Sequence, residues 1–332
     1  MRIAILTTML CLSCYGCEQS SLAHYEYSGA TMGTTFHVTV VGAADQQPPA
    51  GLPQLLQQAL DDIEGLTSTY MQESELSQFN QNASTDWTRV SQQLCRLVEQ
   101  ALEISQETNG AFDITVGPLV NLWGFGPTGS RDEPPGAAEV EALLTRVGFD
   151  KLQTDCEVPA LRKAHAGLNV DLSGWAKGFA ADELAGILIA SGIDNFLAEV
   201  GGELRVQGLN ASGEEWRIAI EKPAANGRDI QAVVNISNTG MATSGDYRNF
   251  FEYAGSRYSH TIDARSGRPV THQLASVTVF DESAATADGM ATALLVLGPD
   301  DGLELATALG IEAIFVVRGP EGFETFRSPS AN

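Results

Sequence analysis

Residues 170–184, VDLSGWAKGFAADEL, constrain the fold more than any other stretch of this chain. The pattern predicts a short apolar strand, a carboxylate at Asp171, a loop through Ser173-Gly174 and a helix with Lys177 in its first turn. A strand-to-helix junction exposes free backbone N–H groups at the positive end of the helix dipole, which suits an anionic ligand. The same pattern is typical of an ordinary packed helix capped by Asp171, with Gly174 as a loop residue. Taken alone, the stretch favours the ordinary helix.

The charge of the chain limits what it can bind. The formal net charge is -23, which argues against nucleic acid or an anionic lipid surface as the main partner. An acidic protein that handles phosphates needs a divalent cation or a few well-placed basic side chains.

Residues 1–17, MRIAILTTMLCLSCYGC, have the features of a secretory signal. The apolar run is too short to span a membrane as a helix. The pattern resembles a bacterial lipoprotein signal peptide, in which a cysteine becomes the lipidated first residue. Cys17 is the first choice for that cysteine and Cys14 the alternative; a plain cleaved signal peptide is the weaker interpretation. Residues 18–25 would then be a tether, and we expect a lipid anchor at the periplasmic face of the bacterial inner membrane.

Cys95 and Cys156 are the cysteines that remain after such a leader is removed. Two cysteines do not make a disulfide scaffold. Cys95 lies in a helical pattern and is interpreted as a small buried apolar residue.

The distribution of helices and strands favours an α+β fold. Alternating or β-rich runs predict strands on either side of Met32-Gly33 and through much of the C-terminal half. The expected strands and hairpins lie at residues 24–42, 195–200, 203–208, 215–223, 230–237, 250–262, 275–281 and 313–326. Helical spacing of apolar residues predicts helices at residues 52–66, 91–108, about 138–147 and 285–298. Residues 127–139 are the best loop candidate and are interpreted as a flap. Because these elements do not alternate regularly as βαβ units, we expect a mixed, largely antiparallel sheet with packed helices.

A few side chains suggest chemistry. Asp288 and Thr292 are four residues apart and therefore share one face of the expected helix. Their oxygens are hard ligands that suit Mg²⁺ or Ca²⁺, although such pairs occur by chance in many helices. His260 lies in SHTID, close to Asp263 and Arg265, but a lone strand histidine is more often structural than catalytic.

The order of several longer sequence blocks is more specific. These blocks are TMGT, STY, GAFDITVGPLVNLWGFGP, VDLSGWAKGFAADEL, EVGGELRVQG, ATSGDYRNF, SHTIDARSGRP and ATADGMATALLVLG. Together they resemble the ApbE family of FAD:protein FMN transferases over nearly the whole mature chain. The resemblance implies that residues 26–330 form a single flavin transferase domain with the ApbE-type α+β architecture, often described as related to the T-fold.

The resemblance also implies a set of site residues. Met32 and Tyr70 would flank the isoalloxazine or adenine ends of FAD, and Ile262 would contact the flavin nucleotide. The nucleotide pocket would be lined by Ala111, Phe112 and Asp113. Asp171 and Lys177 would hold ribose, adenine or phosphate groups. Mg²⁺ would be bound by Asp288, Thr292 and the backbone carbonyl of Gly174. His260 would lie near the attacked phosphorus.

Two positions depart from the family pattern. Ala291 stands where some members carry a carboxylate immediately before the threonine ligand, which leaves the number of protein ligands to the metal open. Lys177 stands where some members carry an acid, and a base beside a pyrophosphate is favourable.

The implied reaction is Mg²⁺-dependent phosphoryl transfer. A threonine or serine hydroxyl of a target protein attacks the FMN phosphorus of FAD and AMP leaves, with His260 and the nearby Arg265 and Arg268 as candidates for proton acceptance and phosphate contact. The resemblance points to subunits of the sodium-translocating NADH:quinone reductase (Nqr) and of Rnf complexes as targets. The alternatives are an FAD-binding lipoprotein that modifies nothing and a Mg²⁺-dependent FAD pyrophosphatase, in which water replaces the hydroxyl.

Overall fold

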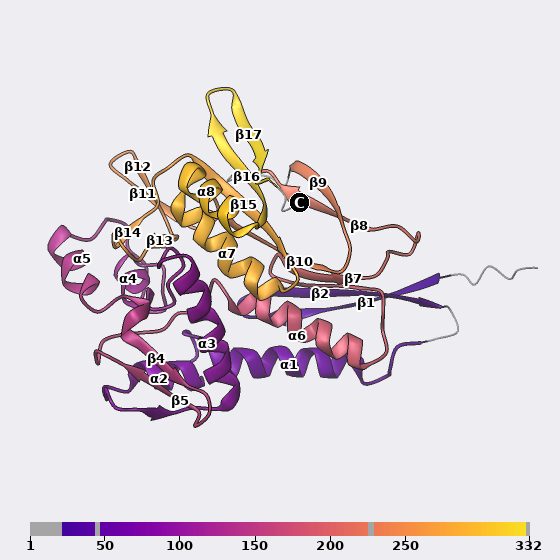
Figure 1. Cartoon of the computed structure of the whole chain (residues 1–332), viewed down its shortest axis with the longest axis horizontal. Helices are drawn as coiled ribbons and strands as arrows, with labels where there is room; N and C mark the ends of the chain where they lie inside the picture. The colour runs from indigo at the N-terminus through magenta and orange to yellow at the C-terminus, as the bar shows by residue number, and fades with distance from the viewer. Residues whose placement is uncertain (1–21, 44–46, 225–228, 330–332) are drawn as a thin grey trace, which may run out of the picture.

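The computed structural model describes residues 22–43, 47–224 and 229–329 (Figure 1). The predicted signal peptide, with Cys14 and Cys17, and the start of the tether lie outside the described residues. Within those ranges no helix has both the length and the apolarity to cross a membrane.

One antiparallel sheet of eight strands runs through the molecule, which confirms the expected α+β class. In spatial order its strands are β1 (Leu22–Thr31), β2 (Thr34–Ala43), β6 (Phe196–Val200), β7 (Glu203–Gln207), β10 (Thr239–Gly245), β15 (Leu274–Asp281), β16 (Glu312–Gly319) and β17 (Gly322–Arg327). The central strand β10, TGMATSG, was not predicted, because it is built of small and polar residues rather than β-branched ones.

Helices cover one face of the sheet (Figure 1). They are α1 (Leu52–Thr67), α6 (Ala176–Ala190), α7 (Ala284–Leu297) and α8 (Pro299–Leu309). Helices α6 and α7 approach so closely that a Cβ at Gly178 would lie 2.3 Å from the carbonyl oxygen of Ala284. This contact fixes the first turn of α6 against α7. Helix α8 was not predicted.

A separate hairpin, β8 (Trp216–Glu221) and β9 (Ile230–Ile236), covers part of the sheet from its other side. Its buried Trp216 and Ile220 pack with Leu204, Val206 and Met241 of strands β7 and β10 in a distinct apolar cluster. The sheet is therefore buried on both faces near β7 and β10.

The stretch at residues 168–172 is extended but forms no strand, in contrast to the prediction. Its only ladder contact is an isolated bridge between Val116 and Asn169. The side chain of Asn80 instead occupies both backbone groups of Val170, since Asn80 Nδ2 donates to the Val170 carbonyl and the Val170 N–H donates to Asn80 Oδ1, each at 2.8 Å. Helix α6 then begins at Ala176, which puts Lys177 in its first turn as expected.

The interpretation of Cys95 as a lone buried residue is wrong in part. Cys95 is fully buried in α3 (Gln92–Glu107), but it forms a disulfide with Cys156. The disulfide joins α3 to the turn between strands β4 (Leu152–Asp155) and β5 (Ala160–Lys163). Strand β5 pairs with β4 on one side and with β3 (Thr88–Arg89) on the other. Helical periodicity contains no information about a partner 61 residues away.

The remaining elements form a small lobe beside the helical layer (Figure 1). They are α4 (Gly117–Leu122), α5 (Ala137–Leu144), and the hairpins β11 (Phe250–Tyr253) with β12 (Ser256–Ser259) and β13 (Ile262–Asp263) with β14 (Arg268–Pro269). Helix α2 (Glu75–Gln81) and a 3₁₀ turn at Phe149–Lys151 pack instead with α3. Stacked aromatic rings hold the first hairpin to the segment after α4, with 5.7 Å between the centroids of Phe125 and Phe251. Residues 127–136 of the predicted flap are irregular, and residues 137–139 already belong to α5. Within the irregular part, Arg131 donates to the carbonyl of Leu122.

Candidate active site

A cavity of about 600 Å³ lies where β7, β10, α6 and α7 meet the small lobe. Nearly all the site residues expected from the sequence line it: Tyr70, Ala111, Phe112, Asp113, Asp171, Gly174, Lys177, His260, Ile262, Asp288 and Thr292. Met32 is not among the lining residues. It lies in the β1–β2 turn with a positive φ of 47°, and its N–H donates to Glu64 Oε2. Any contact between Met32 and a nucleotide would lie beyond the cavity.

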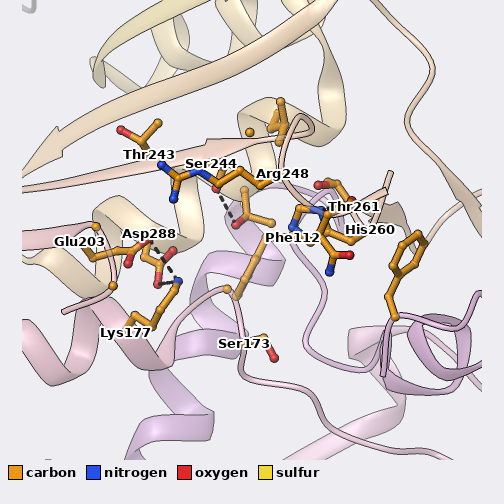
Figure 2. A pocket seen from close by; sticks show the side chains of 18 of the residues that line it. Phe112, Ser173, Lys177, Glu203, Thr243, Ser244, Arg248, His260, Thr261 and Asp288 are labelled. Atoms are coloured by element: carbon orange, nitrogen blue, oxygen red, sulfur yellow. Dashed lines mark hydrogen bonds and ion pairs between the residues drawn. The ribbon is translucent and has the colours of Figure 1, made fainter. Parts of the chain in front are cut away.

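Lys177 lies between two buried carboxylates at one end of the cavity (Figure 2). Its Nζ is 3.1 Å from Glu203 Oε1 and 3.8 Å from Asp288 Oδ2, and the two acid side chains are only 6% and 4% exposed. Asp288 Oδ2 also accepts from the N–H of Gly178 at the start of α6. The three charges therefore tie α6, β7 and α7 together.

Burial and mutual charge shift all three groups. Burial raises the pKa of Glu203 to about 8, against the lowering effect of Lys177. Burial also raises the pKa of Asp288. Burial alone would lower the pKa of Lys177, but Asp288 and Glu203 hold it above its ordinary value. Lys177 therefore stays cationic between its two neighbours, whereas Glu203, with a pKa of about 8, is largely protonated at pH 7.

The oxygens near Asp288 fit a hard divalent cation. Thr292 lies one turn along α7, and a Cβ at Gly174 would lie 3.0 Å from Thr292 Oγ1, so the loop before α6 reaches this hydroxyl. Thr292 Oγ1 is 3.1 Å from Ser244 Oγ of β10. The cluster pairs two buried acids with one ammonium, and Glu203 Oε2 is buried without a hydrogen-bond partner. Carboxylate, hydroxyl and carbonyl oxygens are the ligands that Mg²⁺ prefers, and it retains waters and substrate phosphates as its other ligands.

No group of three or more His, Cys, Asp or Glu side chains suitable for a metal occurs in the part of the chain that the structure describes. The candidate metal site therefore depends chiefly on the carboxylate of Asp288, which shares a helix face with Thr292. Ala291 is fully buried in the apolar core, so the side chain that departs from the family pattern lies in the core rather than in the cavity lining.

His260 lies at the other end of the cavity, in the short segment between β12 and β13 (Figure 2). Its Nδ1 is 3.1 Å from the carbonyl oxygen of Asn249, which also accepts the His260 backbone N–H. A carbonyl can only accept, so Nδ1 carries the proton and Nε2 retains its lone pair. Burial lowers the pKa of His260, which keeps the ring neutral near pH 7. A neutral imidazole with a free Nε2 can accept a proton.

The arginines expected to contact phosphate do not line the cavity. Arg265 pairs with Asp263 at 2.9 Å, and Arg268 is exposed on β14. The cavity contains Arg248 instead, from the turn after β10, where it pairs with Glu221 of β8. Arg248 and Glu203 were both missed, although each lies in a sequence block that carries the family resemblance. Their partners, Glu221 and Lys177, lie in other elements, so no local pattern singles them out.

Two carboxylates expected to contact the nucleotide, Asp113 and Asp171, accept hydrogen bonds from the protein itself. Asp113 Oδ1 accepts from the N–H of Thr115 at 2.8 Å and Oδ2 accepts from that of Phe149 at 2.9 Å. Asp171 Oδ1 accepts from the N–H of Ser173. These bonds give both carboxylates a structural role in shaping their loops, and their contacts with a nucleotide stay predictions.

Tyr70 marks the entrance to the cavity. The residue is 67% exposed, and its hydroxyl donates to the carbonyl of Phe125. The opposite wall near His260 contains Ile262, which is buried and packs with Trp123 of the small lobe. An aromatic rim and an apolar wall around a charged floor suit a ligand with a planar ring and a phosphate group.

Comparison with known proteins places this geometry in a family. The model of the ApbE family matches residues 32–315. A Vibrio cholerae protein named FAD:protein FMN transferase is 42% identical over 332 residues, covering 99% of this chain and 97% of that protein. A Haemophilus influenzae protein of the same name is 39% identical, covering 98% and 95%. The solved structure of the flavin transferase ApbE from Vibrio cholerae has a TM-score of 0.85 at 40% identity, covering 93% of this chain and 98% of that one.

Proposed function

This chain belongs to the ApbE family, and we propose that it is a transferase that moves FMN from FAD to a protein. The observation that carries the proposal is the pairing, across one cavity, of a neutral histidine with a buried oxygen-rich cluster. The first group can accept a proton, and the second can hold a cation against a pyrophosphate.

We further propose that the acceptor is a threonine or serine hydroxyl. The hydroxyl oxygen forms a bond to the FMN phosphorus as the bond from that phosphorus to the bridging oxygen breaks, and AMP leaves with the electron pair. His260 Nε2 accepts the hydroxyl proton, which then passes to solvent. The Asn249 carbonyl holds the tautomer that this step needs.

The divalent cation that best fits these oxygens is Mg²⁺, which Asp288, Thr292 and the carbonyl of Gly174 would hold. When bound, it would neutralise charge on the pyrophosphate. The protein's own contribution is to hold Asp288 in place, through Lys177 and the N–H of Gly178, in a position nearly closed to solvent. This also explains how a chain of net charge -23 handles an anionic substrate.

A single assay tests the function. The protein is incubated with FAD, Mg²⁺ and a candidate target subunit, and in-gel flavin fluorescence is measured together with AMP release. We expect labelled target and AMP in equal amounts, and loss of both with EDTA. AMP and FMN without labelled protein would show an FAD pyrophosphatase, and tight FAD binding with neither product would show an FAD-binding protein only.

The target and the location extend the same proposal. Subunits of Nqr and Rnf redox complexes are the targets to test first, because the family resemblance points to them. A lipid on Cys17 would place the enzyme at the periplasmic face of the bacterial inner membrane. Cys17→Ser should then leave activity in vitro intact and release the protein from membranes. A variant that stays membrane-bound after a high-salt wash would exclude Cys17 and make Cys14 the residue to test.

A further inference from the structure

The charges that line the cavity are unfavourable for a pyrophosphate. Among the described lining residues, Lys177 and Arg248 carry the only Lys or Arg side chains, whereas six lining residues are acidic: Asp113, Asp171, Glu199, Glu203, Glu221 and Asp288. A bound pyrophosphate carries negative charge on both phosphates. The protein must therefore supply cationic groups at the point where charge develops.

The two basic side chains differ in how firmly they are held. Lys177 is paired with two carboxylates that are 6% and 4% exposed, and separating it would leave buried charges without a partner. Arg248 pairs with one carboxylate, Glu221, and the two side chains are 61% and 31% exposed. Its guanidinium also lies 5.6 Å from the centroid of the Tyr247 ring. Ion pairs this exposed contribute little to stability, so Arg248 can exchange partners at small cost.

The turn that holds Arg248 also orients His260. The carbonyl of the next residue, Asn249, is the one that binds His260 Nδ1. Asp246, two residues before Arg248, is anchored by Arg318, with 2.9 Å between Arg318 Nη1 and Asp246 Oδ2. Figure 2 shows the Arg248 side chain extending from the side of His260 toward Thr243 and Glu203, and all of these residues line the same cavity. An arginine on an anchored turn, beside the proposed base and facing the candidate metal site, is placed to reach the phosphate between them.

We propose that Arg248 is a further catalytic residue: when FAD binds, its guanidinium leaves Glu221 and donates hydrogen bonds to a non-bridging oxygen of the attacked phosphate. This inference rests on the proposed transfer of FMN. The planar guanidinium can donate two parallel hydrogen bonds, which a lysine cannot reproduce. These hydrogen bonds from Arg248 stabilise the negative charge that develops in the transition state as the bond to AMP breaks. They should therefore raise the rate of transfer more than the affinity for FAD.

The test is single-turnover flavinylation of a target by wild-type protein and by Arg248→Ala, beside FAD titration by fluorescence. The rate in Arg248→Ala should fall about 10²–10³-fold, with a much smaller change in FAD affinity. Arg248→Lys should recover only part of the rate. Free guanidinium, added well below denaturing concentrations, should restore part of the rate in Arg248→Ala and none in His260→Asn.

Two further variants sharpen the result. Arg268→Ala removes an exposed arginine outside the cavity and should transfer at the wild-type rate. Glu221→Gln frees Arg248 from its resting partner and should leave FAD affinity equal or higher. A wild-type rate in Arg248→Ala, a loss of affinity as large as the loss of rate, or no rescue by guanidinium would each overturn the proposal for Arg248. No transfer by the wild-type protein would instead contradict the proposed function.

Discussion

At one end of the cavity, Lys177, Glu203 and Asp288 come from α6, β7 and α7, and their carboxylates are almost closed to solvent. At the other end, Arg248 and His260 come from irregular segments after β10 and β12, and the Arg248 side chain is 61% exposed. The first end is part of the packed core, where three elements meet. The second is held mainly by turns and by the carbonyl of Asn249.

The difference in burial separates two tasks. Charges in the core interact strongly and are costly to separate, so the buried end can hold a cation in one fixed place. Side chains on partly exposed turns can exchange partners as a substrate enters. The buried end is suited to binding the pyrophosphate. The exposed end is suited to accepting the hydroxyl proton and to stabilising the charge that develops on the phosphate.

The largest expected effect is at the buried end. Asp288→Ala removes the carboxylate assigned to the metal and should lower transfer by more than about 10³-fold at any Mg²⁺ concentration. Asp288→Asn, which keeps the volume of the side chain, should fail similarly. The measurement is flavinylation across a Mg²⁺ titration, with thermal unfolding as the folding control. Wild-type turnover of either variant at millimolar Mg²⁺ would contradict the metal assignment.

At the exposed end, His260→Asn should keep FAD affinity and lose rate. A general base contributes about 10²–10⁴-fold, and asparagine cannot accept the proton. Single-turnover flavinylation beside FAD titration separates the two quantities, and the melting temperature should change little. Equal losses of binding and transfer would place His260 among structural residues.

The contrast between the ends should also appear in stability. Lys177→Met leaves Glu203 and Asp288 buried without a counter-charge and should lower the free energy of unfolding by about 2–4 kcal/mol, somewhat below the usual range for breaking a buried pair because the Lys177 side chain is 30% exposed. Arg248→Met, the matched change at the exposed end, should cost less than about 1 kcal/mol. Urea unfolding measures both. Adding Glu203→Gln to Lys177→Met should recover part of the lost free energy of unfolding. If Lys177→Met and Arg248→Met lowered that free energy by similar amounts, the two ends of the cavity would not differ in how strongly their charges are held.

The smallest expected effect is the dependence of the rate on pH. Burial lowers the pKa of His260, so the ring titrates below the ordinary value of about 6.5. Protonated His260 cannot accept a proton; the transfer rate should therefore be flat near neutral pH and fall about tenfold per unit as the pH drops through that pKa. In His260→Asn this acid limb should be absent. A wild-type midpoint above the ordinary histidine value would contradict a neutral, partly buried base.

Local patterns predicted the elements whose own residues decide their structure. The apolar stripes of α1 and α3 and the alternation in β16 and β17 depend on spacing within a few residues, and the structure contains these elements. Strand β10 was missed because its small residues serve close packing against α7 rather than strand propensity. The predicted strand before α6 does not form because the side chain of Asn80 satisfies the backbone of Val170.

The sequence by itself determined the class of fold, the family and most of the residues that line the cavity, because these depend on periodicity and on the order of continuous blocks. Only the tertiary structure decided what those residues contact. It paired Cys95 with Cys156, fixed Lys177 between Glu203 and Asp288, and placed Arg248 rather than Arg265 or Arg268 in the cavity. Ion pairs and disulfides join residues far apart in the chain, and their partners are set by how the sheet and helices pack, which no local spacing encodes.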